Sequence, residues 1–419
     1  MSYWDVSGKN STDREAWRES VALACRWIID RSQIASDRHD FAETKFKHIG
    51  RFKSWRGAFR GEYEAASGKW DVFCPVWHGG QGVKALVLAY ALLGDKAYLE
   101  AACRGADFIL RHQVAGADNP DAGLILAYEA GAPGINTSAI LECLDGLFTL
   151  SAASKDDRYA RAAIAALRWV QRHMFMPEEG LFRDHYEVGR GVLPRATDQL
   201  HPQPGRPLLD DGAFLTGYAL TGDESLKAVA VRTADRLLAD ENPEGNWKAY
   251  PPANVVSGNI HPRHAFWWGR PMWMVHKVTG AQRYLDCCRR SAAWYAHAMR
   301  SDGGLFRNTG PDFKTPSFGH ATSGIACAAQ LWNDLVREFG DAEWKEALGR
   351  SLRFCRSVQF TRAKDPNLQG AILEKALPPG GTDAPPWYLR DVGTFFYVQA
   401  VCSVLRDAPE LIVGEKTGE

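Results

Sequence analysis

Two short sequence patterns alternate along the whole chain, and they constrain its fold more than any other feature. In the first pattern a helix ends at a glycine or a polar residue, and the next helix begins at once with aspartate or another polar residue. Glycine suits the left-handed position that closes a helix, and aspartate suits the N-cap of the next helix. Each copy therefore predicts a tight turn between two antiparallel helices. The copies are Leu93-Gly94-Asp95, Lys155-Asp156-Asp157, Thr221-Gly222-Asp223, Thr279-Gly280-Ala281 and Phe339-Gly340-Asp341.

The second pattern is a glycine followed by one or two apolar residues. Its six copies are about sixty residues apart and alternate with the copies of the first pattern, so coincidence is a poor explanation. They are Gly57-Ala58-Phe59, Gly123-Leu124-Ile125, Gly180-Leu181-Phe182, Gly245-Asn246-Trp247, Gly304-Leu305-Phe306 and Gly370-Ala371-Ile372.

The segments between these patterns have helical periodicity. Six segments are apolar on nearly all sides, which predicts buried inner helices, and six are amphipathic, which predicts outer helices with one face in solvent. Strict alternation of six inner and six outer helices predicts an all-α fold, the (α/α)6 toroid. The inner helices are expected near 78–93, 136–153, 210–221, 266–279, 320–339 and 389–405, and the outer helices near 13–31, 95–113, 156–174, 223–240, 281–299 and 341–358.

The repeats occupy nearly the whole chain, so we expect one barrel domain over residues 1–407 and a loosely held tail over 408–419. Tight turns close one face of this barrel, and long loops join outer helices to inner helices at the other face. Long loops in compact domains are usually functional, and the inner helices direct their N-termini toward this face, which favours bound anions. The functional site is therefore expected among the long loops, near 32–77, 114–135, 175–209, 241–265, 300–319 and 359–388.

Composition and charge exclude several classes of partner. The 50 basic residues balance the 50 acidic ones, so net charge gives no reason to expect nucleic acid or an anionic membrane as a partner. No apolar run approaches the ~20 residues that span a bilayer, and the first five residues carry no apolar signal core. The nine cysteines are typical of reduced thiols. These features favour a cytoplasmic protein and leave its oligomeric state open.

The chain lacks the motifs of common metal and cofactor sites. It has no H-E-x-x-H or C-x-x-C spacing, no G-x-G-x-x-G after a strand, no P-loop and no nucleophile elbow. We therefore expect neither a metal nor a cofactor.

Two consecutive aspartates, Asp210 and Asp211, open the third inner helix at the loop-rich face. A carboxyl that is partly desolvated beside a second carboxyl has a raised pKa and can act as a general acid or base. The alternative is that both aspartates cap the helix. Glu142 and Asp145 form an i, i+3 pair deeper in the second inner helix, where a buried carboxylate is costly unless it is paired, so Asp145 is a further candidate. We expect catalysis by Asp210 or Asp211.

The start of the fourth inner helix, residues 261–273, holds two histidines, two arginines and three tryptophans. Spacings of three to four residues place His264 on one helix face with Trp267 and Trp268. His264 is therefore a candidate acid or base, and the tryptophans, including Trp273, are candidates for stacking on sugar rings. Arg270 can bind a substrate carboxylate in bidentate fashion. The alternatives are barrel core for the tryptophans and a buried ion pair for Arg270, with Asp210, Asp211 or Asp391.

Further polar and aromatic residues lie at the mouths of the other inner helices. His320 is a fourth catalytic candidate. The others can bind sugar hydroxyls or stack on sugar rings, or they can cap and pack the helix starts. These substrate-binding candidates are Trp77, His78, Gln81, Asn136, Trp387, Tyr388 and Arg390.

Together these features resemble the six-hairpin glycosidase superfamily of (α/α)6 barrels. The local motifs are most similar to those of unsaturated glucuronyl and rhamnogalacturonyl hydrolases. Asp211-Gly212-Ala213-Phe214 resembles their Asp-Gly-x-Phe motif, and Trp268-Gly269-Arg270-Pro271-Met272-Trp273 resembles their Trp-x-Arg-Gly-x-x-Trp motif. Where the second inner helix of that family opens with an aspartate, this chain has Asn136. The resemblance implies that Asp211, or Asp210, protonates an unsaturated sugar and activates water.

A weaker likeness exists to the N-acylglucosamine 2-epimerase group, which includes cellobiose epimerases. Pro262, His264 and Trp268 match the proline, histidine and final tryptophan of its Pro-Gly-His-x-x-Glu-Trp motif. This resemblance implies that His264 and His320 form the acid/base pair that moves a proton at C2.

Two further interpretations stay open. A polysaccharide lyase would need a base and a group that neutralises a substrate carboxylate, for which the candidates are Asn136, Arg270, His264 and Tyr388. A non-catalytic protein would bind glycans through the toroid alone. We favour a glycoside hydrolase that cleaves a glycosidic bond in a uronic-acid-containing oligosaccharide by carboxylate acid/base catalysis. The oligosaccharide is the one partner that we expect.

Overall fold

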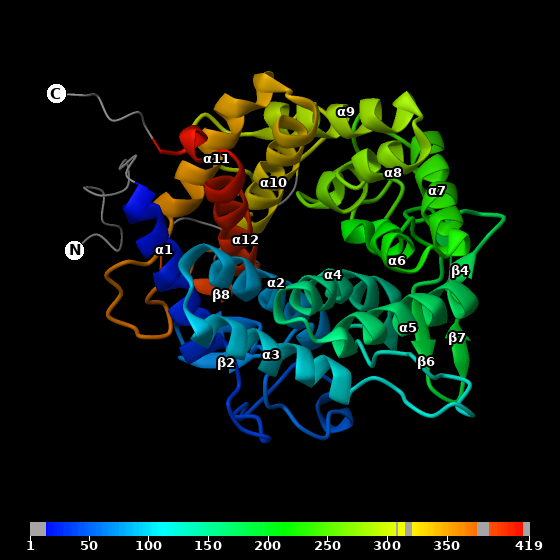
Figure 1. Cartoon of the computed structure of the whole chain (residues 1–419), viewed down its shortest axis with the longest axis horizontal. Helices are drawn as coiled ribbons and strands as arrows, with labels where there is room; N and C mark the ends of the chain where they lie inside the picture. The colour runs from blue at the N-terminus through cyan, green and yellow to red at the C-terminus, as the bar shows by residue number, and fades with distance from the viewer. Residues whose placement is uncertain (1–13, 196, 307–308, 315–320, 375–384, 414–419) are drawn as a thin grey trace.

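The computed structural model describes residues 14–195, 197–306, 309–314, 321–374 and 385–413. Twelve α-helices in this part of the chain form a ring in which inner and outer helices alternate (Figure 1). This confirms the (α/α)6 toroid. The inner helices are α2 (Pro75–Leu93), α4 (Thr137–Ser154), α6 (Ala213–Thr221), α8 (Met272–Thr279), α10 (Thr322–Phe339) and α12 (Val392–Asp407). The outer helices are α1 (Arg14–Trp27), α3 (Lys96–Arg111), α5 (Asp157–His173), α7 (Glu224–Ala239), α9 (Gln282–Ala298) and α11 (Lys345–Ser357).

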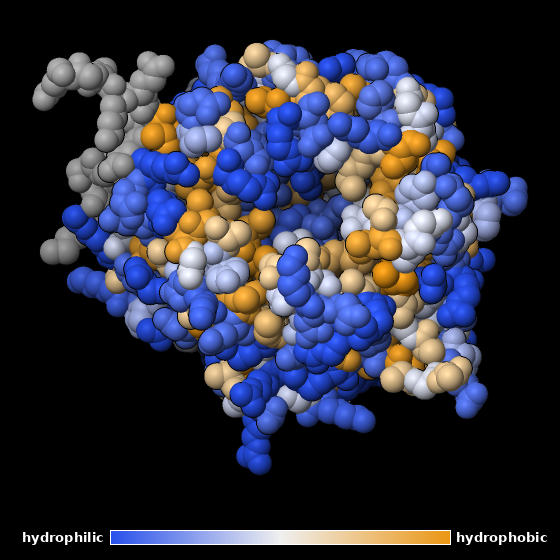
Figure 2. Space-filling view, viewed as in Figure 1, coloured by the Kyte–Doolittle hydropathy of each residue, from blue (hydrophilic) through white to orange (hydrophobic). Residues whose placement is uncertain are grey.

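The inner helices pack side by side, and α12 contacts both α2 and α10, so the ring closes between the last and the first inner helix. Glycines let α2 and α4 approach closely. A Cβ atom on Gly80 would lie 2.3 Å from the Cα of Cys143, and one on Gly146 would lie 2.1 Å from the carbonyl oxygen of Gly80. In the space-filling view the ring surrounds a central hollow with a hydrophilic floor (Figure 2).

The first repeated pattern forms the tight turns that it predicted. Gly94, Gly222, Gly280 and Gly340 each close an inner helix in the left-handed conformation, with φ between 69° and 79°. Lys155 does the same after α4, with φ 61°. Aspartate side chains then accept hydrogen bonds from backbone amides of the next helix, as the N-cap preference predicts. These capping residues are Asp95, Asp156 and Asp223.

The second repeated pattern holds each long loop against an outer helix. Gly123, with φ 97°, lies so close to α5 that a Cβ atom would be 2.6 Å from the carbonyl oxygen of Ala165. In the same way, a Cβ atom on Gly370 would lie 2.5 Å from the carbonyl oxygen of Leu23 in α1. This contact holds the last long loop against the first outer helix. In the fifth copy Gly303, and not Gly304, takes this position. Only glycine combines the positive φ with this close approach, which explains the repeat. The equivalent glycines are Gly57, Gly180 and Gly245.

The third and fourth inner helices are shorter than their sequence patterns predicted. A short turn, η3 (Asp210–Gly212), precedes α6, with both Asp211 (φ 50°) and Gly212 (φ 65°) in the left-handed region. A π-helical turn, η4 (Ala265–Gly269), precedes α8. Pro271 follows this turn and has no amide hydrogen to donate, so the regular helix begins after it.

The long loops carry small antiparallel sheets beside the starts of the inner helices. One sheet has the order β2 (Lys69–Asp71), β1 (Glu62–Glu64), β8 (Tyr388–Arg390). A second has the order β3 (Ile135–Asn136), β6 (His185–Glu187), β7 (Gly191–Leu193), and a third pairs β4 (Phe175–Met176) with β5 (Leu181–Phe182). Four short turns complete the described elements: η1 (Ile28–Ser32), η2 (Ile49–Arg51), η5 (Ala342–Trp344) and η6 (Pro409–Leu411).

The segment after Asp407 is packed on the barrel as far as it is described, although the sequence suggested a loose tail. Ile412 is buried, and the indole of Trp17 donates a hydrogen bond to its carbonyl oxygen (3.1 Å). Within the described residues, each helix is too short or too polar to cross a membrane.

Candidate active site

A cavity of about 450 Å³, here called the central cavity, lies at the loop-rich face beside the N-termini of α2 and α4. It combines aromatic rings, carboxylates and guanidinium groups, the mixture expected of a site for a polar ligand with apolar faces. Its lining residues are Phe73, Trp77, Glu129, Gly131, Ala132, Asn136, Ser138, Glu142, Asp184, His185, Arg206, Pro251, Pro252, His261, Arg263, Trp267 and Arg390.

Glu142 is a buried carboxyl that lines this cavity, two turns into α4. One oxygen accepts a hydrogen bond from the Ser138 hydroxyl (2.6 Å), and the other accepts one from the indole of Trp267 (3.0 Å). Burial raises the pKa of Glu142 to about 8, against the opposing effects of Ser138 and Arg263. The group is therefore mainly protonated at neutral pH and is held in one orientation, as a general acid must be.

The aspartates of η3 point to different places. Asp210 is buried and is not part of the cavity lining, and burial together with the charge of Glu142 raises its pKa well above the usual range. Asp211 points along the barrel interior instead. It accepts a hydrogen bond from Gln81 (3.1 Å) and lies 3.5 Å from the guanidinium of Arg270 and 3.7 Å from the ammonium of Lys84.

Arg263 is a buried cation at the cavity without a carboxylate partner in the described part of the chain. Its guanidinium lies 5.0 Å from the ring centre of Trp77 and 5.2 Å from that of Trp267, so two aromatic faces stabilise it. It donates one hydrogen bond, to Ser323 (3.1 Å), and its Nε has no partner. A buried charge is costly unless it is paired, which makes Arg263 the group most ready to receive an anionic ligand.

Another part of the cavity lining is a network of paired charges. Burial favours a neutral Asp184, but Arg206 (2.5 Å) and Arg195 (2.8 Å) keep its pKa below the usual range. Asn136 caps α4, accepting from the amide of Ser138 (2.9 Å), and also bonds Arg206 and Glu129. Burial raises the pKa of Glu129, against the effect of Arg206.

The structure brings four of the substrate-binding candidates to the central cavity: Trp77, Asn136, Trp267 and Arg390. Five residues lie in the barrel core. His78 pairs with Asp391 through a fully buried contact of 2.6 Å, and Gln81 bonds the backbone carbonyl of Glu142 (2.7 Å). His264 is fully buried outside the cavity lining, and burial lowers its pKa to about 3. The other two core residues are Trp268 and Trp387.

A second cavity, of about 220 Å³, lies nearer the C-terminal ends of the long inner helices α2, α4 and α12, and we call it the far-end cavity. Because α6 and α8 begin late, three candidates at their starts reach this cavity: Asp211, Arg270 and Trp273. Arg270 forms ion pairs, which were the alternative to substrate binding: one with Asp211 (3.5 Å), a predicted partner, and a shorter one with Asp334 (2.7 Å), which was not predicted. Tyr388 lines a third cavity, described below. His320 lies outside the described residues.

Sequence reasoning did not select several lining residues, namely Glu129, Asp184, His185, Arg206, His261 and Arg263. Most lie in long loops that have no periodicity to fix their direction. Glu142 was not selected either: the cost of a buried carboxylate in this helix, which is apolar on nearly all sides, pointed to Asp145, and Asp145 pairs with Lys84 (2.5 Å). Within the described residues, His, Cys, Asp and Glu side chains form no group of three or more that could hold a metal ion.

Comparison with solved structures finds the same fold in several carbohydrate-active enzymes. The unsaturated glucuronyl hydrolase of Bacillus sp. GL1, responsible for glycosaminoglycan degradation, is 14% identical with a TM-score of 0.65, covering 94% of this chain and 97% of its own. The cellobiose 2-epimerase of Spirochaeta thermophila is 12% identical with a TM-score of 0.64, covering 94% and 98%. An inactive variant of an α-1,6-mannanase from Salegentibacter sp. HEL1_6, with two consecutive aspartates replaced and mannotetrose bound, is 11% identical with a TM-score of 0.57, covering 92% and 98%.

No family model and no curated protein matches the sequence. At 11–14% identity, the likeness to these solved structures establishes the fold that this chain shares with them.

Proposed function

We propose that this chain is a glycoside hydrolase that cleaves a glycosidic bond in an oligosaccharide containing a uronic acid, with Glu142 as the general acid. The observation that carries the proposal is the position of Glu142, a buried carboxyl with a raised pKa on a cavity that also holds an unpaired guanidinium and two tryptophan rings. Hydrolases and epimerases among the structural neighbours support an enzyme that acts on carbohydrate.

The proposed chemistry follows from the protonation state of Glu142. Its proton passes to the glycosidic oxygen, or to the double bond if the uronate is unsaturated, and leaves a carboxylate stabilised by Ser138 and Trp267. Water adds at the carbon that becomes electron-poor and loses a proton, which restores the acid on Glu142. When the glycosidic oxygen is protonated it leaves as an alcohol; when the double bond is protonated, the hydrated sugar is a hemiketal whose ring opens and then releases that alcohol. General acid catalysis of this kind contributes about 10²- to 10⁴-fold to the rate.

Asp210 is the second buried carboxyl of this region. Burial, together with the charge of Glu142, raises its pKa well above the usual range. It does not line the central cavity, so we assign it no contact with the substrate.

Arg263 is proposed to bind the substrate carboxylate, with Trp77 and Trp267 contacting the sugar ring. A guanidinium donates parallel hydrogen bonds to a carboxylate, and the guanidinium of Arg263 lines the cavity without a carboxylate partner among the described residues. Aromatic rings beside polar groups suit the apolar face of a pyranose.

The buried state of His264 favours hydrolysis over epimerisation by this residue. Its pKa of about 3 leaves the imidazole neutral, and it does not line the central cavity. Tyr388, a base candidate for a lyase, lines a different cavity.

The test is to incubate the protein with acidic polysaccharides and with unsaturated oligosaccharides produced from them by lyases, and to follow the ultraviolet absorbance of the unsaturated uronate. Loss of absorbance, abolished in Glu142→Gln, supports the proposal. A gain of absorbance would indicate β-elimination and contradict hydrolysis. No change, together with exchange of a sugar hydrogen for solvent deuterium, would contradict it in favour of epimerisation.

A further inference from the structure

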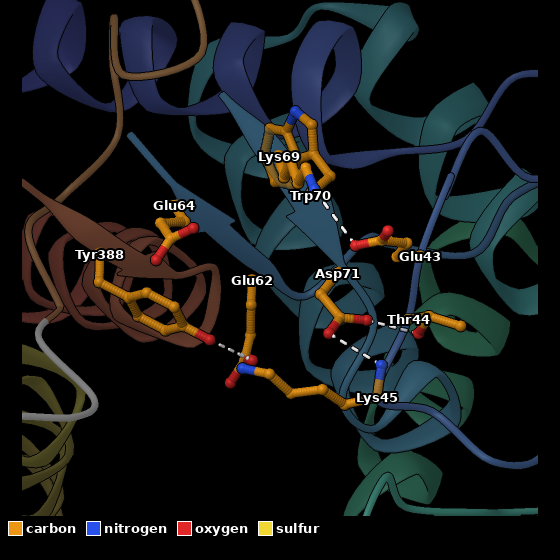
Figure 3. A pocket seen from close by; sticks show the side chains of 9 residues that line it. All are labelled: Glu43, Thr44, Lys45, Glu62, Glu64, Lys69, Trp70, Asp71 and Tyr388. Carbon is orange, nitrogen blue, oxygen red and sulfur yellow. Dashed lines mark hydrogen bonds and ion pairs between the residues drawn. The ribbon is translucent and has the colours of Figure 1, made fainter. Parts of the chain in front are cut away.

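A third cavity, of about 410 Å³, lies on one face of the sheet β2–β1–β8, and we call it the sheet cavity (Figure 3). Residues 43–45 form its other wall. The function proposed above does not use it. The side chains that matter here are Lys45, Glu62, Glu64, Lys69, Asp71 and Tyr388.

Strand register explains why this face is polar. Glu62 pairs with Asp71 on one side and Arg390 on the other, and Glu64 pairs with Lys69 and Tyr388. Directly paired and alternate residues share a face of a sheet, so the side chains of these paired residues all project from the same face. They are Glu62, Glu64, Lys69, Asp71, Tyr388 and Arg390.

The sheet cavity is adjacent to the central cavity, and one ion pair separates them. Arg390 lines the central cavity, and its Nε donates to Glu62 (2.8 Å). Glu62 also accepts a hydrogen bond from the hydroxyl of Tyr388, which lines the sheet cavity (Figure 3). Glu62 and Arg390 are buried, whereas Glu64 and Lys69 are exposed to an incoming ligand. The two cavities are therefore linked through the contacts of Arg390 and Tyr388 with the same carboxylate, Glu62.

The charges of the sheet cavity select against a second acidic sugar. Four carboxylates but only two lysines line it. Asp71 is occupied by the Thr44 hydroxyl (2.5 Å) and the backbone amide of Lys45 (3.1 Å), and Glu62 by Arg390 and Tyr388. The other charged groups of the rim are held only by exposed contacts: Lys69 pairs with Glu43 (3.2 Å), and Glu64 accepts a hydrogen bond from Ser67. Exposed ion pairs contribute little, so sugar hydroxyls can replace these partners. The Lys45 ammonium, 6.0 Å from the centre of the Tyr388 ring, adds a further donor.

We propose that the sheet cavity binds an uncharged sugar unit of the same oligosaccharide whose uronate lies in the central cavity. This inference rests on the proposed function and extends it. The substrate would then carry its acidic sugar at one position and a neutral sugar further along the chain, and longer oligosaccharides would bind more tightly than a disaccharide.

The test is isothermal titration calorimetry on the Glu142→Gln protein, which binds without turnover. The probes are an unsaturated glucuronate disaccharide, a tetrasaccharide with the same end and otherwise neutral sugars, and a tetrasaccharide that is sulfated throughout. We expect the neutral tetrasaccharide to bind about tenfold more tightly than the disaccharide, and the sulfated one to lose that gain. Lys45→Ala combined with Glu64→Ala should remove the gain, whereas Lys96→Ala, an exposed change on α3, should retain it.

The outcomes separate the two proposals. If the disaccharide and the neutral tetrasaccharide bind equally, or if the double variant weakens both to the same degree, the sheet cavity does not bind sugar and the proposed function still stands. If none of the three probes binds, the proposed function fails and this inference fails with it.

Discussion

Replacing Glu142 with glutamine should stabilise the protein at alkaline pH and leave its stability unchanged in acid. Burial raises the pKa of Glu142 from 4.5 to about 8 in the folded protein, while the unfolded chain keeps the lower value. Below pH 4.5 the carboxyl is protonated in both states. Above it, only the unfolded state gives up the proton, so the free energy of unfolding falls with rising pH until the folded form ionises near pH 8. At about 1.4 kcal/mol per pH unit, the loss reaches about 5 kcal/mol as an upper limit.

A glutamine at this position fits the same hydrogen bonds. Its amide NH₂ can donate to the Ser138 hydroxyl, and its oxygen can accept from the Trp267 indole. The variant therefore removes the ionisation cost without creating a cavity.

The assay is urea unfolding of wild type and Glu142→Gln at several pH values from about 4.5 to about 8.5. The difference in the free energy of unfolding should be near zero at the acid end and grow to several kcal/mol in favour of the variant at the alkaline end. Glu100→Gln, at an exposed position on α3, is the matched control and should show no such trend. Parallel stability curves for wild type and Glu142→Gln would refute the raised pKa and the reasoning built on it.

Three other changes give sharp expectations. Arg263→Gln should raise the Kd for an acidic oligosaccharide by about 10- to 100-fold, measured by calorimetry, with little effect on a neutral analogue; equal losses on both would show a structural role. Gly123→Ala should cost about 1–3 kcal/mol more in urea unfolding than Gly189→Ala, because both positions have positive φ but a Cβ atom meets a backbone oxygen only at Gly123. Asp211→Asn should lower the free energy of unfolding by about 1–3 kcal/mol, because Lys84 and Arg270 lose a partner but keep Asp145 and Asp334. It should leave kcat within about tenfold of wild type, and a larger loss would place Asp211 in the chemistry.

The fold could be predicted from the sequence because its signals are local. A glycine at a left-handed helix end and an aspartate that caps the next helix act within a few residues, as at Gly94 and Asp95. The second pattern was visible as a repeat, but its cause was not, because the contact that requires Gly123 comes from α5, about forty residues further on.

The site could be predicted only in part, because sequence spacing does not show which side chains reach a cavity. The left-handed conformation of Asp211 sends its carboxylate along the barrel toward Lys84. Helical spacing correctly placed His264 beside Trp267 (5.6 Å between ring centres) and Trp268 (4.5 Å), but it did not show that His264 is fully buried outside the cavity lining. The cost of a buried carboxylate singled out Asp145, which pairs with Lys84 (2.5 Å), instead of Glu142.

The measurement that tests the central claim most directly is the rate of oligosaccharide cleavage by Glu142→Gln compared with wild type, on the substrate that the absorbance assay identifies. If Glu142 is the acid, the variant should fold normally, bind the oligosaccharide with a similar Kd and lose about 10²- to 10⁴-fold in kcat. Wild-type kcat should also fall as pH rises through about 8, where Glu142 loses its proton. A variant that binds and cleaves at the wild-type rate would contradict the account.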